Sequence, residues 1–185
     1  EDIFPVERLR PGMDLLPPVS SIYEDENEDV WIGTLNQGLY HWNSQNKLLN
    51  RYREDAEVPF AIAGNSVRSI FKDKDRKIWV LTSNGITRIE AKSSLTFLKG
   101  MNTNVATQDK NGKIWVGTFG EGLYAKDPGA DKFQQVQQYG ADVFPENLVI
   151  EAILDDKKGN IWIGTYGNGL YLLDEKEEKI LHFLP

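Results

Sequence analysis

The feature that most constrains the fold is a ten-residue segment that occurs in four copies along the chain. The last copy runs from Trp162 to Tyr171 and reads Trp-Ile-Gly-Thr-Tyr-Gly-Asn-Gly-Leu-Tyr. Near copies run from Trp115 to Tyr124 and from Trp31 to Tyr40. A shorter copy runs from Trp79 to Ile86, with Leu81 in place of the first glycine. Because recurrence of one segment indicates recurrence of one structural unit, the sequence predicts a repeat protein.

The spacing of the copies identifies the unit. The four tryptophans lie 48, 36 and 47 residues apart, and an aspartate lies six residues before each of them: Asp25, Asp73, Asp109 and Asp156. A period of about 40 to 50 residues, rich in tryptophan, glycine and β-branched residues, is typical of propeller blades. Helical repeats need an apolar period near 3.6 residues, and none is sustained here. We therefore predict an all-β fold, a β-propeller of about four blades, each a four-stranded antiparallel sheet.

The copies also divide the chain. We expect a strand and loop at residues 1–18, then blade 1 (19–60), blade 2 (61–99), blade 3 (100–139) and blade 4 (140–185). The strands expected in these blades are 19–25, 30–34, 39–43 and 48–52; 66–73, 77–82, 86–90 and 95–98; 104–108, 113–118, 123–127 and 132–138; 149–155, 160–165, 170–174 and 179–184. The first strand, residues 3–9, is either the last strand of an incomplete blade or a closing strand that pairs elsewhere.

Each aspartate opens a predicted hairpin turn. In two copies a glycine stands at the fourth place of the turn, Gly112 and Gly159, where it takes the positive φ that the hairpin needs. Glu28 and Arg76 stand at this place in the first two copies. We therefore expect the turns of blades 1 and 2 to differ in shape from the others.

The tryptophans Trp31, Trp79, Trp115 and Trp162 are interpreted as core residues rather than ligand platforms. Apolar residues nine and twelve positions before the tryptophans are three apart, an odd spacing that requires a bulge or burial on both faces. A glycine lies two residues after the tryptophan in three copies: Gly33, Gly117 and Gly164. We expect these glycines to let a neighbouring backbone approach closely.

Composition excludes several classes of protein. The 185 residues carry a net charge of -7 with no basic stripe, so we expect no nucleic-acid partner. The absence of cysteine excludes disulfides, thiolate metal sites and cysteine nucleophiles. The sequence has no apolar run of 18 residues, so no membrane span is expected in this chain. We expect no cofactor.

The repeats resemble the two-component regulator propeller repeat, on the pattern Asp-x-x-Gly, then Ile-Trp-Ile-Gly-Thr and Gly-Leu-Tyr. The match runs from Val19 to Pro185 and is fullest at Asp156, Gly159, 161–165 and 169–171. The resemblance implies the periplasmic sensor region of a hybrid two-component system, which detects oligosaccharides and signals to a histidine kinase elsewhere in the parent protein. Members of this family typically have more blades than four, so we expect a piece of a longer sensor or a short relative.

Two sets of loops, those that join the second strand to the third and those that join successive blades, are expected at the ligand-binding end. An aromatic ring covers the apolar face of a sugar, and amides satisfy its hydroxyl groups. The predicted binding residues are Phe60, Phe119, Phe144, Tyr166, Asn36, Gln37, Asn147 and Asn168. For Phe60 and Phe144 the alternative is that each ring pins its own loop against the blades.

Other activities are weighed against sensing. Residues 25–29 begin like a calcium loop, but Val30 and Asn36 stand where such a loop needs glycine and glutamate, so no metal is predicted. His41 and His182 are the two histidines, and no glycine-flanked serine is present, so this chain is not expected to be an enzyme. A propeller glycosidase or lyase stays an alternative, because two placed acids suffice for glycoside hydrolysis. A protein-interaction scaffold is a second alternative.

The number of blades raises the question of assembly. Four blades either close on themselves, as four-bladed propellers do, or leave two apolar blade faces open. Open faces predict a homodimer.

Overall fold

The computed structural model describes residues 7–9, 17–55, 61–90 and 94–184, and these contain strands and turns. Within these ranges no helix is long and apolar enough to cross a membrane. The chain divides into two compact units, Glu1–Gly100 and Met101–Pro185, each built around two blade sheets.

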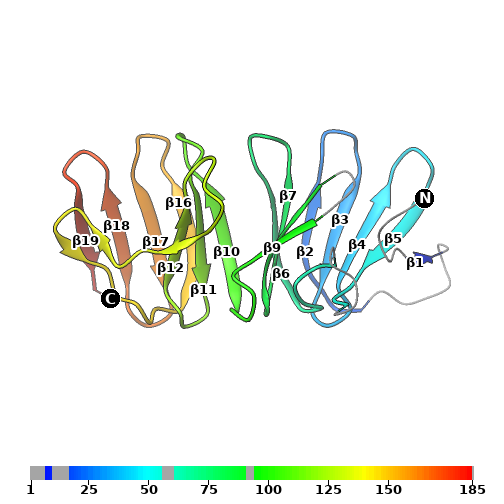
Figure 1. Cartoon of the computed structure of the whole chain (residues 1–185), viewed down its shortest axis with the longest axis horizontal. Helices are drawn as coiled ribbons and strands as arrows, with labels where there is room; N and C mark the ends of the chain where they lie inside the picture. The colour runs from blue at the N-terminus through cyan, green and yellow to red at the C-terminus, as the bar shows by residue number, and fades with distance from the viewer. Residues whose placement is uncertain (1–6, 10–16, 56–60, 91–93, 185) are drawn as a thin grey trace. The chain divides into compact units, whose positions relative to one another are not determined.

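The first unit holds blades 1 and 2 (Figure 1). Blade 1 has β2 (Val19–Glu24), β3 (Val30–Thr34), β4 (Leu39–Asn43) and β5 (Leu48–Tyr52), with β1 (Glu7–Leu9) added outside β5. Blade 2 has β6 (Val67–Lys72), β7 (Ile78–Thr82), β8 (Gly85–Ile89) and β9 (Ser94–Phe97). Of the two roles expected for the first strand, β1 takes that of a strand that pairs outside a blade of its own, because it is antiparallel to β5.

The second unit holds blades 3 and 4. Blade 3 has β10 (Thr103–Gln108), β11 (Ile114–Thr118), β12 (Leu123–Lys126) and β13 (Gln134–Gln135). Blade 4 has β16 (Ile150–Asp155), β17 (Ile161–Thr165), β18 (Leu170–Asp174) and β19 (Lys179–Phe183). A separate hairpin, β14 (Gln138–Tyr139) with β15 (Asp142–Val143), lies between these blades in sequence. The prediction of antiparallel, four-stranded propeller blades is confirmed.

The last strand of blade 3 is the main departure from the predicted strands. Residues 132–138 were expected to form one strand, but β13 is two residues long and the chain then turns into the β14–β15 hairpin. Four of the five residues from Gln134 to Gln138 are glutamines, which offer no alternating apolar face to hold a longer strand against a core.

The first strand of every blade contains the irregularity that the odd apolar spacing predicted. The register shifts between Val19 and Ser21, between Val67 and Ser69, and at the corresponding places in β10 and β16. The bulge lets residues three apart share a face, and the sequence prediction is therefore confirmed.

Blades pack face to face within each unit. In the first unit, Trp31 and Leu39 of blade 1 share a core with Val67, Ile70 and Val80 of blade 2. In the second unit, a core forms from these residues of blades 3 and 4 and the segment between them: Trp115, Leu123, Ala125, Phe144, Leu148, Ile150, Ile161, Ile163, Tyr171 and Leu173. Three of the four repeat tryptophans, Trp31, Trp79 and Trp115, are buried, as expected, whereas Trp162 is only half-buried and departs from that expectation.

The glycines after the tryptophan accommodate a side chain rather than a backbone. A Cβ at Gly33 would overlap the side chain of Val67, and a Cβ at Gly117 would overlap that of Ile150. The expectation that a neighbouring backbone approaches there is wrong, because the first residue of the next blade's inner strand fills the space. At Gly164 a Cβ would meet Ala152 at 3.5 Å, an ordinary contact.

The repeat aspartate joins the turn to the tryptophan. In blade 3, Asp109 Oδ1 accepts hydrogen bonds from the N–H groups of Asn111 (2.8 Å) and Lys113 (3.0 Å), while Oδ2 accepts the indole N–H of Trp115 (2.9 Å). The indoles of Trp79 and Trp31 donate in the same way to Asp73 (2.7 Å) and Asp25 (3.4 Å). In blade 4, Asp156 Oδ2 instead accepts from the Asn160 amide (2.7 Å).

The turns do not differ in the way expected. Glu28 and Arg76 adopt positive φ values of 62° and 63°, at the place where Gly112 has 87°. In all three blades the residue at this place donates its N–H to the carbonyl of the aspartate that opens the turn. Blade 4 differs instead, because both Lys157 and Gly159 have positive φ there, at 63° and 113°. The hydrogen bonds to the aspartate therefore impose the turn shape even on residues with a Cβ.

The strained turn residues predict a stabilising substitution. Glu28→Gly relieves a left-handed conformation that costs an L-residue about 1 to 2 kcal/mol, and the gain is partly offset by the entropy of glycine in the unfolded chain. We expect the free energy of unfolding to rise by about 0.5 to 1 kcal/mol in urea titrations. Asn27→Gly in the same turn is the matched control and is expected to destabilise. Equal effects of the two changes would contradict the argument.

Asp109 binds both its turn and a buried indole, whereas Asp156 binds no indole. We therefore expect the two aspartates to differ in their contribution to the free energy of unfolding. Asp109→Ala leaves the buried Trp115 N–H without its acceptor and removes two backbone acceptor contacts, so we expect a loss of about 3 kcal/mol. Asp156→Ala removes contacts to its turn and to the half-buried Asn160 amide rather than to a buried indole, and we expect a smaller loss. Thermal and urea unfolding of both variants test this order. A loss at Asp156 equal to or above that at Asp109 would rule it out.

Candidate ligand-binding site

The threonine that ends the second strand of each blade shapes the loop that follows it. Thr118 Oγ1 donates to the carbonyl of Gly122 at 2.7 Å and accepts the N–H of Glu121 at 2.9 Å. Thr34 and Thr165 donate to Gly38 and Gly169 in the same way, each at 2.7 Å. Each loop is therefore closed by its own threonine, a role that sequence reasoning missed.

In each blade, the residue after the threonine donates its backbone N–H to the carbonyl of the residue that immediately precedes the blade's first strand. These N–H···O bonds are Leu35 to Pro18 (3.1 Å), Ser83 to Ser66 (3.0 Å), Phe119 to Asn102 (2.8 Å) and Tyr166 to Val149 (2.9 Å). The side chains are left outside the core: Leu35 is 46% exposed, Phe119 53% and Tyr166 75%. A rigid backbone thus presents exposed side chains at this end of the blades.

In the second unit, two of the predicted binding residues contact the same residue through their backbones. Phe119 forms an isolated β-bridge with Val149, and Tyr166 donates its N–H to the carbonyl of the same Val149. Asn147, two residues before Val149, is exposed, and so is Asn168 in the loop that carries Tyr166. We define these four residues, Phe119, Tyr166, Asn147 and Asn168, as the aromatic rim.

The other predicted residues do not belong to this rim. Asn36 and Gln37 are exposed in the first unit, where the Gln37 side-chain oxygen accepts a hydrogen bond from Arg51 at 2.9 Å. Phe60 lies outside the described residues. Phe144 has no exposed surface and packs edge-on against Tyr171, with ring centroids 5.4 Å apart. Its burial corrects the expectation that it contacts a ligand and fits the alternative that it pins its loop.

The second unit also contains a cavity of about 580 Å³ beside the outer part of blade 3. Its lining includes Gln134, Gln137 and Gln138, all exposed, together with Trp115 and the half-buried Tyr139. Sequence reasoning missed this hollow, which exists because β13 ends after two residues. The run of glutamines in place of an alternating strand is the signal that marked it.

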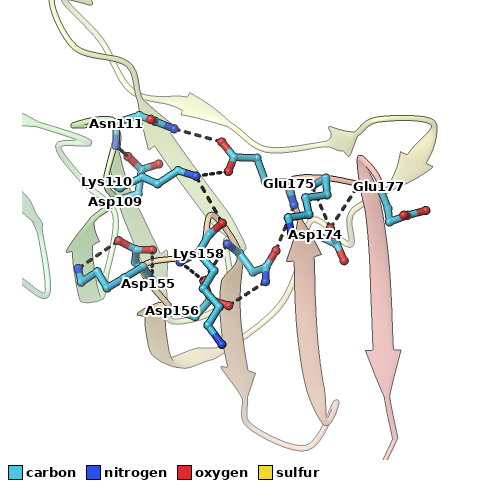
Figure 2. Close-up of polar contacts among 12 residues, drawn as sticks. Asp109, Lys110, Asn111, Asp155, Asp156, Lys158, Asp174, Glu175 and Glu177 are labelled. Atoms are coloured by element: carbon cyan, nitrogen blue, oxygen red, sulfur yellow. Dashed lines mark hydrogen bonds and ion pairs between the residues drawn. The ribbon is translucent and has the colours of Figure 1, made fainter.

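The opposite end of this unit is held by contacts among its own side chains (Figure 2). Lys110 in the blade 3 turn pairs with Glu175 in blade 4 at 2.6 Å, and Asn111 donates to the same carboxylate at 3.2 Å. The Lys110 hydrogen bond lowers the pKa of Glu175 and raises the pKa of Lys110. This end therefore joins blades 3 and 4, whereas the aromatic rim is open to solvent.

Both histidines are engaged in packing. His41 stacks on Trp31 with ring centroids 3.9 Å apart, and its Nε2 lies 3.0 Å from Asp29 Oδ2. His182 stacks on Tyr171 at 4.0 Å, and its Nε2 lies 2.7 Å from the carbonyl of Asn168. Burial lowers the pKa of His41 against the opposing effect of Asp29. Neither ring meets a serine hydroxyl in these contacts.

The acidic turn at residues 25–29 uses its carboxylates internally. Asp25 accepts the N–H groups of Asn27 and Asp29, and Asp29 accepts from Asn43, Ser44 and His41. Across the described part of the chain, no group of three or more histidine and acidic side chains is placed to hold a metal ion.

Comparison with known proteins supplies the family. The model of the two-component regulator propeller matches residues 16–36, 61–84, 98–120 and 144–167, which in each blade run through the repeat tryptophan and threonine. The fold and the four matches define a β-propeller built from regulator repeats. The chain belongs to the two-component regulator propeller family.

Individual relatives are longer than this chain. Histidine kinase P4 of Formosa agariphila is 30% identical over 70 residues, which cover 36% of this chain and 5% of that protein. The extracellular domain of the putative hybrid two-component system BT4673 of B. thetaiotaomicron is similar with a TM-score of 0.76 and 24% identity, over 96% of this chain and 23% of that one. Virginiamycin B lyase of Staphylococcus aureus follows at 0.68 and 16%, over 97% and 59%. The last two similarities concern the fold alone.

The burial of His41 predicts a pH dependence. Since its folded pKa lies below the ordinary value of about 6.5, the unfolded chain takes up the proton first as the pH falls. The contribution of His41 to stability is therefore complete above about pH 6.5 and is lost as the pH falls through the folded pKa. NMR titration of the imidazole should give a pKa below 6.5.

A substitution checks the same point. His41→Phe keeps a ring against Trp31 and should flatten the loss of stability below pH 6.5. His182→Phe, which also keeps a stacked ring, is the matched control for the loss of an imidazole. A His41 pKa at or above 6.5 would contradict this account.

Proposed function

We propose that this chain is a ligand-sensing propeller of an extracytoplasmic sensor in a two-component system. The ligand is an oligosaccharide, it binds at the aromatic rim, and binding is signalled to a histidine kinase elsewhere in the parent protein. The proposal rests mainly on one observation. The backbones of Phe119 and Tyr166 both contact Val149, and both rings are exposed to solvent.

The relatives support the sensing role. One is named a histidine kinase, and another is the extracellular domain of a putative hybrid two-component system. This chain spans 5% and 23% of these two, so a kinase in the same polypeptide would lie outside the four blades. The same comparison supports an extracytoplasmic location, and we propose the periplasm, with the parent protein anchored in the membrane.

The chemistry of the rim supports an uncharged, polyhydroxylated ligand. Aromatic surface in contact with water is unfavourable in free energy. Stacking of a ring against the C–H face of a sugar buries that surface. The neutral amides of Asn147 and Asn168 donate and accept hydrogen bonds without the desolvation penalty of a charged group. The rim residues therefore suit a neutral sugar better than a phosphate or a peptide carboxylate.

Several observations support binding rather than catalysis. The histidines are stacked on Trp31 and Tyr171, and the repeat aspartates are occupied by backbone and indole donors. A glycosidase needs two carboxylates about 5 to 10 Å apart that face a sugar. The four rim residues include no carboxylate. The alternative of a lyase or glycosidase is tested by checking whether the ligand stays intact.

Mutation of the rim tests the proposed site. A panel of plant and host oligosaccharides is first screened by thermal shift, and the sugar that binds is titrated calorimetrically. Phe119→Ala and Tyr166→Ala should each weaken affinity by about fivefold to 150-fold, because each removes a stacking surface worth about 1 to 3 kcal/mol. Their unfolding temperatures should change little, since both side chains are exposed.

Controls separate the rim from the cavity and binding from cleavage. Tyr166→Phe keeps the ring and should retain most of the affinity. Lys110→Ala, at the opposite end of the unit, should leave binding unchanged. If Gln134→Ala with Gln138→Ala removes binding while the rim variants do not, the site is the cavity and the rim assignment is wrong. Chromatography that finds the sugar cleaved would replace the sensor by an enzyme.

A further inference from the structure

The cavity beside blade 3 has the size of a site for a small molecule. Its volume is about 580 Å³, and ligand sites in proteins commonly measure about 300 to 1,000 Å³. All of its lining residues lie between Lys113 and Glu146, so the cavity belongs wholly to the second unit. None of the four residues of the aromatic rim lines it. The cavity is therefore a candidate site separate from the rim.

One wall of the cavity is the sheet of blade 3. Trp115, Ala125 and Gln134 stand opposite one another on β11, β12 and β13, so their side chains share one face of the sheet. The indole N–H of Trp115 is already bound to Asp109, which leaves the ring rather than a polar group for the cavity. This wall therefore offers apolar surface with an amide on its outer strand.

A second wall is the segment 136–144, which contains the β14–β15 hairpin and is fixed at both of its ends. At one end, Val136 donates its N–H to the carbonyl of Leu123 in blade 3 at 2.8 Å. At the other end, Phe144 donates its N–H to the carbonyl of Gln137 at 2.9 Å, and its ring is fully buried in the core. The base of the hairpin is therefore tied to the blades.

The tip of the hairpin is tied to blade 4. β15 lies beside β19 (Figure 1), and the carboxylate of Asp142 accepts the N–H of Ile180 at 2.8 Å. Gly140 lies so close to the carbonyl of Glu178 that a Cβ there would overlap it. Since both ends and the tip of this wall are held, the cavity is preformed, and a ligand does not lose affinity by ordering it.

Three glutamines of these walls have side chains that the fold does not use. Gln134, Gln137 and Gln138 are exposed, and across the described ranges their side-chain amides have no hydrogen-bond partner. Gln135 also lines the cavity but differs, because its Nε2 donates to the carbonyl of Glu121 at 3.0 Å. Each unused amide can donate two hydrogen bonds and accept two. The cavity therefore presents donors and acceptors from both walls.

The charged groups of the cavity argue against an ionic ligand. Lys113 pairs with Asp127 at 3.1 Å, and its Nζ lies 5.1 Å from the centre of the Trp115 ring, so its charge is already balanced. Glu146 is exposed to solvent. A carboxylate in that position repels an anion and, because water screens it, binds a cation weakly. The lining therefore favours a ligand that is polar and uncharged.

We propose that this cavity binds a neutral saccharide of one or two rings, held by the amides of Gln134, Gln137 and Gln138 and packed against Trp115 and Tyr139. Sugar hydroxyl groups donate and accept hydrogen bonds as the amides do, and the apolar face of a sugar packs on an aromatic ring. This site goes beyond the function proposed above, because it requires neither the rim nor a kinase.

NMR titration of the isotope-labelled chain, followed through its side-chain amide signals, tests the proposal. The probes share a ring and differ in charge: glucose, glucosamine and glucuronic acid, then galactose with its amino and acid forms. Cellobiose and lactose are the disaccharides. The signals of Gln134, Gln137 and Gln138 are assigned by their loss in single Gln→Ala variants. We expect a neutral sugar to shift these signals to saturation and to bind more tightly than its charged forms.

Substitution of the amides gives the second measurement. Gln134→Ala with Gln138→Ala should weaken the affinity for that sugar by about fivefold to 150-fold, because two hydrogen bonds are lost. Gln45→Ala removes an exposed glutamine from a turn of the first unit, so it is the matched control and should leave the affinity unchanged. All three glutamines are exposed, and circular dichroism of both variants should match that of the unmodified chain.

Three results would overturn the proposal. One is that none of these sugars shifts the glutamine signals to saturation. Another is that only an amino or acid form does so, because the ligand would then be ionic. The third is that the double glutamine variant keeps the affinity of the unmodified chain. If Phe119→Ala with Tyr166→Ala removes that retained binding, the sugar lies at the rim, and the function proposed above stands while the cavity site fails.

Discussion

In blades 1 to 3, one carboxylate near the start of the repeat binds both the hairpin turn and the tryptophan of the core. Asp109 accepts two backbone N–H groups that fix the hairpin and the indole N–H that fixes Trp115 in the core. The same aspartate position forces Glu28 and Arg76 into a left-handed conformation that side chains disfavour. Turn geometry and core packing are therefore set by one group, so three different turn sequences give the same hairpin.

The repeat also specifies how blades meet. A tryptophan face, a β-branched face and a glycine that leaves room for the next blade's first residue are all encoded within one unit. Because these features have a direction, blades add in one order. The loops shaped by the threonines join the next blade through backbone contacts, such as the Gly38 N–H to the Asn65 carbonyl, and leave the side chains of Leu35, Phe119 and Tyr166 exposed and free to differ between blades.

Much of this was predictable from local sequence. The repeat spacing gave the blades, and the odd spacing of Val19 and Ile22 gave the bulge, since both are periodic signals. Two predictions failed because partners distant in sequence decide the outcome: the burial of Phe144 and the side chain beside Gly33. The prediction for Glu28 and Arg76 failed for a local reason, since the aspartate three residues earlier imposes a positive φ on a residue with a Cβ. Phe119 and Tyr166 were identified as aromatic loop residues, but their meeting at Val149 was not visible in the sequence.

The shared anchor at Val149 gives the rim a mechanical property. Phe119 belongs to blade 3 and Tyr166 to blade 4, and both backbones are fastened to the same residue between the two blades. A bound molecule that shifts the backbone of either loop must therefore also shift Val149. Backbone movement in one loop is thus coupled to both blades, while the exposed rings keep their rotamer freedom.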